Sequence, residues 1–244
     1  MLSTVTDAWQ TLVPPEGDRH GPLHPLLLLL TVVTGLVDAF SYLVLGHVFV
    51  ANMTGNVVFL AFALAGAAGF SLAASALALA AFAVGAVVSG RVVTHLGPRR
   101  GRVLAITATF EVVVTAVAVV VGWTVVDPGH GLTRYVLVTL LAVGAGMQNG
   151  TARKLAVPDL TTTVLTQTIA GLAFESRIGG GTNSRIGRRG LAAVAMFIGA
   201  LVGAALELHV SQPLGLLVAL VLLIIVAVAA GRLSRGGPAW DSPT

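Results

Sequence analysis

The stretch that decides the fold is PLLLLLTVVTGLVDAFSYLVLG, residues 25–46, in which Asp38 is the one charged side chain. A helix needs about 20 apolar residues to cross the hydrocarbon core of a bilayer, so this stretch is long enough. Similar apolar stretches follow it at 49–68, 71–96, 103–126, 134–157, 160–174, 190–209 and 213–231. The sequence therefore predicts an all-α protein, a polytopic bundle of transmembrane helices.

The composition leads to the same class. Apolar residues make up 56% of the chain and charged residues 10%, against about 25% charged in a soluble domain. Cysteine is absent, which excludes disulfides, a thiolate nucleophile and thiolate-bound metal. The net charge of +4 comes from basic residues between apolar segments, which is typical of membrane topology. We expect the lipid bilayer as partner and no nucleic acid.

A weak internal repeat relates the two halves at a shift of about 111 to 114 residues. Gly35 then falls on Gly146, Thr54 on Thr166, and Gly85 on Gly199. Each half is a pair of segments interrupted by polar residues, followed by two clean helices. The predicted divisions are a leader at 1–24, a first repeat at 25–126, a loop at 127–133, a second repeat at 134–231 and a tail at 232–244.

Basic loops predict the number of crossings, since Arg and Lys collect in cytoplasmic loops. The basic clusters are Arg99, Arg100 and Arg102, then Arg185, Arg188 and Arg189, then Arg232 and Arg235. Eight crossings cannot place all three clusters inside. Six crossings can, if 25–68 and 134–174 each cross once and contain a broken or re-entrant segment, which makes an inverted repeat. The alternative is eight crossings in a parallel repeat.

The same charge pattern predicts a multi-pass membrane protein with both termini cytoplasmic. The leader has no basic start and carries acidic residues, so we expect no cleaved signal. Trp9, Leu12 and Val13 suit either a short helix at the membrane interface or a disordered leader.

Asp38 is the first candidate for a functional role. A charge at that depth costs at least ~2.5 kcal/mol. Thr34, Asp38 and Ser41 share one helical face. This polar stripe predicts a cation or proton site, or else a hydrogen-bonded packing contact.

Further polar residues occupy corresponding places in the two halves. The run Asn52-Met-Thr54-Gly-Asn56 is typical of a helix break that coordinates a ligand, or of hydrogen bonding between helices. The second half offers Gln148, Asn149, Thr166 and Thr168. A site with one carboxylate opposite neutral amides and hydroxyls favours a cation or a polar solute as substrate.

Glu111 is the other deep carboxylate. It is expected to serve as a proton relay or to pair with Arg91 or Arg134. The sequence contains no zinc motif, no nucleotide fingerprint and no Gly-x-Ser-x-Gly elbow. We therefore expect no metal, no cofactor and no enzymatic activity.

Three elements together carry a family resemblance: Thr34 to Asp38, the run from Val48 to Asn56, and Gly146 to Asn149 with the Thr-rich run after it. With them the chain resembles the YoaK family of uncharacterised bacterial inner-membrane proteins, usually drawn with six helices. The resemblance covers nearly the whole chain and implies this fold and a location in the bacterial plasma (inner) membrane, without a substrate. Thr166-Gln167-Thr168 stands where the family would have a Thr-Gly pair.

Two functions remain open at this point, and a third, an intramembrane enzyme, would need Asp38 and Glu111 to converge within reach of one substrate atom. The first is a small secondary transporter or permease for a small cation or polar solute, with the polar residues of both halves lining one site. The second is a non-transporting membrane scaffold or assembly partner, in which those residues join helices. Small Gly and Ala faces leave room for a homodimer.

Overall fold

The computed structural model describes residues 2–97, 99–125, 127–160, 162, 165–176, 179–181, 186–235 and 239–241. Throughout these ranges the regular structure is helical, as the sequence predicts. The α-helices are α1 (Leu2–Leu12), α2 (Leu23–Leu43), α3 (Met53–Leu64), α4 (Leu72–Leu96), α5 (Arg100–Thr124), α6 (Gly131–Leu155), α7 (Leu165–Phe174), α8 (Ile186–His209) and α9 (Leu214–Leu233). A short 3-10 helix, η1 (Ala239–Asp241), follows them.

Five of these helices, α2, α4, α5, α8 and α9, are long and apolar enough to cross a membrane. Helix α6 is as long as α4 and α5, at 25 residues, but it is more polar because it contains Arg134, Gln148, Arg153 and Lys154. Helices α3 and α7 have 12 and 10 residues, which is too short for a single helix to span the hydrocarbon core. Helix α3 lies within the predicted apolar stretch 49–68, and α7 lies within the stretch 160–174.

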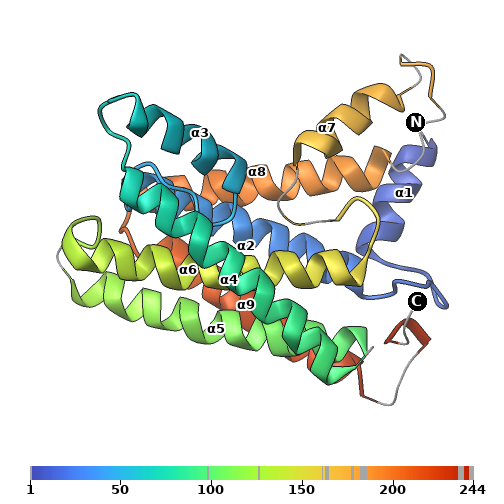
Figure 1. The fold of residues 1–244 in the computed structure, drawn as a ribbon. Coiled ribbons are helices and arrows are strands. Elements are labelled where there is room, and N and C mark those ends of the chain that lie inside the picture. Colours follow the sequence, from blue (N-terminus) through green and yellow to red (C-terminus); the bar gives the residue numbers. More distant parts are fainter. Residues whose placement is uncertain are drawn as a thin grey trace.

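The long helices lie side by side and alternate in direction along the chain (Figure 1). Helix α4 packs against α6, α2 against α8, and α5 against α9; α5 also touches α6, and α2 touches α9. Helix α3 lies near one end of the bundle against α4, and α7 lies near the other end against α8 (Figure 1). Helix α2 begins at the end where α6 finishes, so these two helices run in opposite directions.

Glycines allow the two closest helix pairs to touch through their backbones. A methyl group on Gly35 of α2 would overlap the carbonyl oxygen of Met196 on α8, and one on Gly199 of α8 would overlap that of Val32 on α2. Close approach of this kind is typical of small residues at helix interfaces in membranes.

The second pair, α4 and α6, repeats this arrangement. A methyl group on Gly85 would overlap the carbonyl oxygen of Val143, and one on Gly146 would overlap that of Phe82. Both crossings therefore place a glycine of each helix against backbone of the partner, so neither helix of either pair can carry a larger side chain at that point.

The end of the bundle that carries α1, α7 and η1 is closed by Arg100. Its buried guanidinium donates from Nη2 to the carbonyl of Leu155 at 2.6 Å and to His20 Nδ1 at 2.8 Å. Next to it, the N–H of Gly101 donates to Asp241 Oδ1 at 2.6 Å. The segment before α2 and the tail after α9 therefore both cover this end.

The leader contains a helix rather than an irregular segment. Helix α1 packs on α8, where the N–H of Arg188 donates to Asp7 Oδ2 at 2.9 Å. Trp9 and Leu12 of α1 are exposed, which fits the short amphipathic helix that was one of the two expectations.

Candidate functional site

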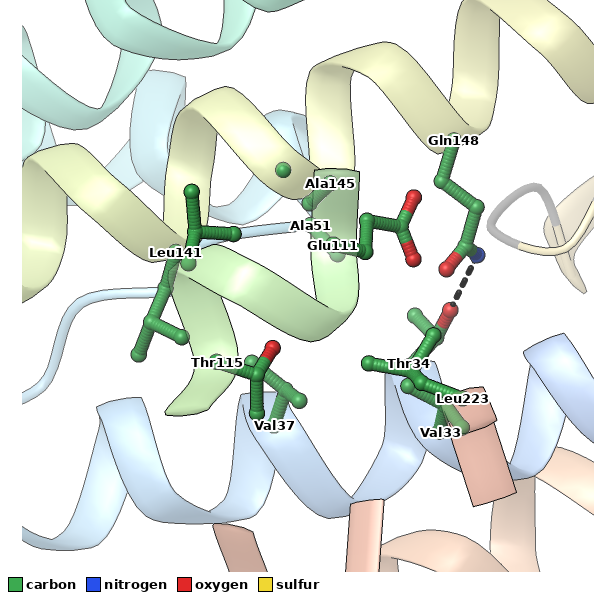
Figure 2. A pocket seen from close by; sticks show the side chains of 12 residues that line it. Val33, Thr34, Val37, Ala51, Glu111, Thr115, Leu141, Ala145, Gln148 and Leu223 are labelled. Carbon is green, nitrogen blue, oxygen red and sulfur yellow. Dashed lines mark hydrogen bonds between the residues drawn. The ribbon is translucent and has the colours of Figure 1, made fainter. Parts of the chain in front are cut away.

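A small cavity lies between α2, α5 and α6, near the middle of these helices (Figure 2). Its volume is about 20 Å³, which is room for roughly one water molecule. Four polar side chains line it: Thr34, Glu111, Thr115 and Gln148. The rest of the wall is apolar or small, formed by Val33, Val37, Ala51, Val114, Leu141, Gly144, Ala145 and Leu223.

Glu111 has the most demanding environment of these residues. Its side chain is 4% exposed, and its Oε1 has no hydrogen-bond partner among the described residues. A buried polar atom left without a partner costs about 1–3 kcal/mol, and more when it carries a charge. The carboxyl extends from α5 toward the side of the cavity where Gln148 lies (Figure 2).

The partners that the sequence suggested for Glu111 are engaged or lie elsewhere. Arg134 donates from Nη2 to the carbonyl oxygen of Gly46 at 2.8 Å, and Arg91 is exposed on α4. The ion pairs found among the described residues do not include Glu111. An ion pair among the described residues therefore does not explain why Glu111 is buried. A buried acidic side chain without an ion-pair partner is a candidate for a functional role.

Thr34 and Gln148 come together across the two halves of the chain. Gln148 Nε2 donates to Thr34 Oγ1 at 2.9 Å, and the Thr34 hydroxyl donates to the carbonyl of Leu30 at 2.9 Å. Figure 2 shows this bond between α2 and α6 beside the cavity. Two residues predicted from sequence thus meet at one wall of the cavity.

Asp38 lies outside this cavity and is saturated with hydrogen bonds. Its side chain is 3% exposed. Its Oδ1 accepts from the N–H of Val50 at 3.1 Å and of Ala51 at 2.9 Å, and its Oδ2 accepts from Asn52 Nδ2 at 2.5 Å. Ser41, on the same face, donates to the carbonyl of Asp38 at 3.2 Å. The carboxylate therefore fixes the chain that enters α3.

Asn56 has a similar structural role. Its Oδ1 accepts from the N–H of Phe49 at 2.9 Å, and its Nδ2 donates to the carbonyl of the same residue at 2.6 Å. This pair of bonds folds the segment before α3 back onto the helix. Thr54, two residues earlier, is exposed.

The predicted residues of the second half are dispersed. Thr166 is exposed, Thr168 is buried on α7, and Asn149 is half-buried on α6. Of the ten residues proposed from sequence as a substrate site, the cavity collects Thr34 and Gln148, together with the separately proposed Glu111. Thr161 and Thr163 of the Thr-rich run lie outside the described residues, as does Arg185 of the second basic cluster.

A chain of three buried hydroxyls was missed by sequence reasoning. Thr151 Oγ1 of α6 lies 3.0 Å from Ser89 Oγ of α4 and 2.8 Å from Thr107 Oγ1 of α5. Thr107, Glu111 and Thr115 are spaced by four residues on α5, so they share one helical face. That spacing could have linked Thr107 to Glu111, but no spacing along one helix joins Ser89 and Thr151 to them.

A second polar cluster ties α7 to the bundle at the end that carries Arg100. Arg189 of α8 donates from Nε to Asp159 Oδ1 at 2.8 Å, and its Nη1 lies 2.8 Å from Glu175 Oε2. Asp159 belongs to the loop before α7, and Glu175 directly follows α7. One arginine therefore holds both ends of this short helix.

Comparison with known proteins places the chain in a family. The family model described as "Protein of unknown function (DUF1275)" matches residues 26–229. The UPF0700 transmembrane protein YoaK of Bacillus subtilis (strain 168) is 33% identical over 154 residues, a segment that covers 61% of this chain and 65% of that protein. No solved structure matches the chain.

The relative is described as a transmembrane protein, which agrees with the five candidate membrane spans of this chain. The family match agrees with the resemblance read from Thr34 to Asp38, from Val48 to Asn56 and from Gly146 to Asn149. The chain belongs to the DUF1275 family and is a YoaK-like multi-pass membrane protein.

Proposed function

We propose that this protein is a small secondary transporter whose substrate is a small cation or a small polar solute. The observation that carries the proposal is the cavity between α2, α5 and α6, into which a buried carboxyl, two hydroxyls and an amide converge. Oxygen ligands around one acidic group suit a cation better than an anion. With a volume of about 20 Å³, the cavity has room for roughly one water molecule, and in this proposal it represents a closed state of the transporter.

The transport mechanism in this proposal rests on two inverted halves, α2 to α5 and α6 to α9. Under the sequence shift, α2 corresponds to α6, α4 to α8, and α5 to α9. The packing of α4 on α6 then has its counterpart in the packing of α8 on α2, and the glycine crossings are counterparts too. Helices α2 and α6 run in opposite directions (Figure 1), which supports inversion and the alternating access that inverted repeats perform.

Six crossings follow if α6 spans the membrane despite its polar residues. Its Arg153 and Lys154 stand in the last turn, where long basic side chains reach the interface. Of the described Arg and Lys residues, only Arg134 lies toward the end opposite Arg100. This asymmetry supports cytoplasmic termini in a plasma membrane.

The absence of cysteine from the chain allows a test that needs no knowledge of the substrate. Single cysteines at Thr34, Thr115 and Gln148 would each be the only thiol, and a small charged thiol reagent would be applied to either side of proteoliposomes. We expect labelling at these positions. A cysteine at Ala118, which is buried on α5 away from the cavity, is the matched control. Labelling at the cavity no faster than at Ala118 would overturn the transporter proposal.

Flux measurements would then test the cation class. Liposomes containing the protein would be loaded with dyes sensitive to pH, to sodium or to potassium and given gradients of sodium, potassium or protons. We expect at least one cation to move faster than in protein-free liposomes, and Glu111→Gln to abolish the difference. Accessible cavity cysteines without any cation flux would point to a neutral polar solute.

A second candidate is a non-transporting scaffold or assembly partner. It is favoured by Asp38, whose carboxylate is fully engaged in holding the start of α3. Exposed faces such as Val194, Phe197, Ile198 and Leu201 of α8 could meet lipid or a second copy in a homodimer. Cavity cysteines closed to reagent from both sides would support this candidate.

A further inference from the structure

We infer that the three hydroxyls of Ser89, Thr151 and Thr107 form a proton path between the Arg100 end of the bundle and Glu111. The inference rests on the proposed function in one respect, since it makes Glu111 the coupling group of the transport site. It assigns a task to a hydroxyl chain that the substrate site does not use.

The hydroxyl chain is continuous and buried. Ser89, Thr107 and Thr151 are each at most 2% exposed, and the two oxygen-to-oxygen distances are 3.0 and 2.8 Å. Each residue comes from a different helix, so the chain crosses from α4 through α6 to α5. Hydroxyls both donate and accept hydrogen bonds, which is the property that a proton path requires.

The inner end of the chain points to Glu111. Thr107 stands one helical turn before Glu111 on the same face of α5, about 6 Å along the axis. The cavity beside Glu111 has a volume of about 20 Å³, enough for one water molecule. Thr107 is not among the residues that line it, so the path also requires a water molecule that bridges from the Thr107 hydroxyl to the carboxyl. Gln148, one turn before Thr151 on α6, lines the same cavity.

The outer end of the chain approaches the end of the bundle that carries Arg100. Ser89 is followed by Gly90, beside which there is open space, and by Arg91, which is exposed. Helix α4 then ends at Leu96. From Ser89 to the end of the helix is about 10 Å of axial rise, which a hydrated arginine side chain partly spans.

The described polar groups that line the cavity with Glu111 are Thr34 from α2, Thr115 from α5 and Gln148 from α6, and all of them are neutral. Among the described residues, therefore, no positively charged side chain lines this cavity. Taking an isolated carboxylate out of water is costly without a positive partner. Glu111 therefore needs a supply of protons when no cation occupies the cavity.

The transfer conserves atoms and charge. A proton from water at the outer end binds the oxygen of Ser89 while that hydroxyl passes its own proton to Thr151. Thr151 and Thr107 act in the same way, and the bridging water gives a proton to a carboxylate oxygen of Glu111. One O–H bond forms on Glu111, one is lost from the bulk, and the three hydroxyls are restored.

The test follows protonation of Glu111 directly by time-resolved infrared spectroscopy of the full chain in liposomes. A pH jump from about 9 to about 3 passes through the ordinary carboxyl range, and the C=O band of Glu111 is the band lost in Glu111→Gln. We expect Thr107→Val and Thr151→Val to slow the rise of this band by about tenfold, which corresponds to an increase of about 1.4 kcal/mol in the barrier to proton transfer. Thr107→Ser and Thr151→Ser should restore the rate.

The matched controls are Thr109→Val on α5 and Thr139→Val on α6. Their hydroxyls bond only to the carbonyls of Ala105 and Tyr135, one turn earlier on their own helices. Unchanged rates in Thr107→Val and Thr151→Val would overturn the proton path, as would a Glu111 band that does not respond to pH. This readout is independent of cysteine labelling. If the Glu111 band depends on the hydroxyls while the cavity cysteines do not react with the reagent, the proton path is supported and the transporter proposal is rejected.

Discussion

The backbone N–H of Ala51 donates a hydrogen bond to Asp38 Oδ1 at 2.9 Å, which joins α2 to the chain that enters α3. Backbone groups released by a break in a helix need partners when water is scarce. Asp38 supplies them for Ala51 and for Val50. A carboxylate that looked like a substrate ligand in the sequence therefore acts as an anchor for a short helix.

Replacing Asp38 should destabilise the protein. Asp38→Ala leaves two buried N–H groups without an acceptor, and we expect a loss of about 2–3 kcal/mol. That loss corresponds to roughly 2–4 °C in Tm per kcal/mol for a chain of this size. Thermal unfolding in detergent would measure it.

The double variant Asp38→Asn with Asn52→Asp is the control for the anchor. It exchanges donor and acceptor across the bond between these two side chains, so it should recover part of the stability that Asp38→Asn loses. An Asp38→Ala protein as stable as the parent would contradict the anchoring role.

Glu111→Met should leave the fold intact or stabilise it. The substitution removes a buried carboxyl oxygen without a partner and keeps most of the volume, so the expected gain is about 1 kcal/mol. Proton and cation flux should be lost in the same protein, the trade-off that functional sites commonly show. A marked fall in Tm would instead mean that Glu111 is structural.

The glycine crossings should tolerate no side chain. Gly35→Ala and Gly146→Ala each force a methyl group into the backbone of a neighbouring helix, and we expect a loss of at least about 2 kcal/mol or failure to insert stably. Gly90→Ala, on α4 with open space around it, is the matched control and should have no such effect. The expression level and Tm of the three variants would test this prediction. If Gly35→Ala and Gly146→Ala were as well expressed and as stable as Gly90→Ala, the close helix crossings would be contradicted.

Stability should fall as the pH drops below about 6.5, because of His20. Burial and then the neighbouring Arg100 lower the pKa of this histidine, against the raising effect of Asp18, while Arg188 and Arg19 lower it further. The unfolded chain, with a histidine pKa near 6.5, thus binds more protons than the folded one between that value and the lowered pKa. Stability therefore rises with pH across this window and is lost as the pH falls through it.

Tm measured from about pH 8 to about pH 5 in the parent and in His20→Gln would test this dependence. Gln keeps an acceptor for Arg100 but does not titrate, so its Tm should fall less. His24 packs against His20, so the same two proteins would be compared with His24→Gln present in both. Identical pH profiles would exclude His20 as the cause.

Arg189→Gln should loosen α7 without unfolding the bundle. The substitution removes the ion pairs with Asp159 and Glu175, which are partly exposed and so worth up to about 1 kcal/mol each. Hydrogen exchange should accelerate in residues 165–174, while α3, held by buried Asp38, should exchange as before. Arg188→Gln, one position away, is the control; faster exchange throughout the chain would contradict a local role.

The amino-acid sequence determined the membrane class and most helix positions. Long apolar runs have one stable form in lipid, the helix, because every backbone group must be paired within the segment. The predicted stretch 25–46 corresponds to α2, and the stretches 49–68 and 160–174 contain the short helices α3 and α7. Gly35, Gly85, Gly146 and Gly199, which align at the shift predicted from the sequence, all lie where two helices touch through their backbones, and such close contact favours small residues.

The tertiary structure alone decided which polar residues share a site. Thr34 and Gln148 meet although they are 114 positions apart, whereas Asp38 turns toward the chain before α3 and Thr54 faces outward. Spacing along one helix tells which side chains share its face, but not which other helix covers that face. The hydroxyl chain from Ser89 to Thr107 joins three helices, and its members met only when those helices packed together.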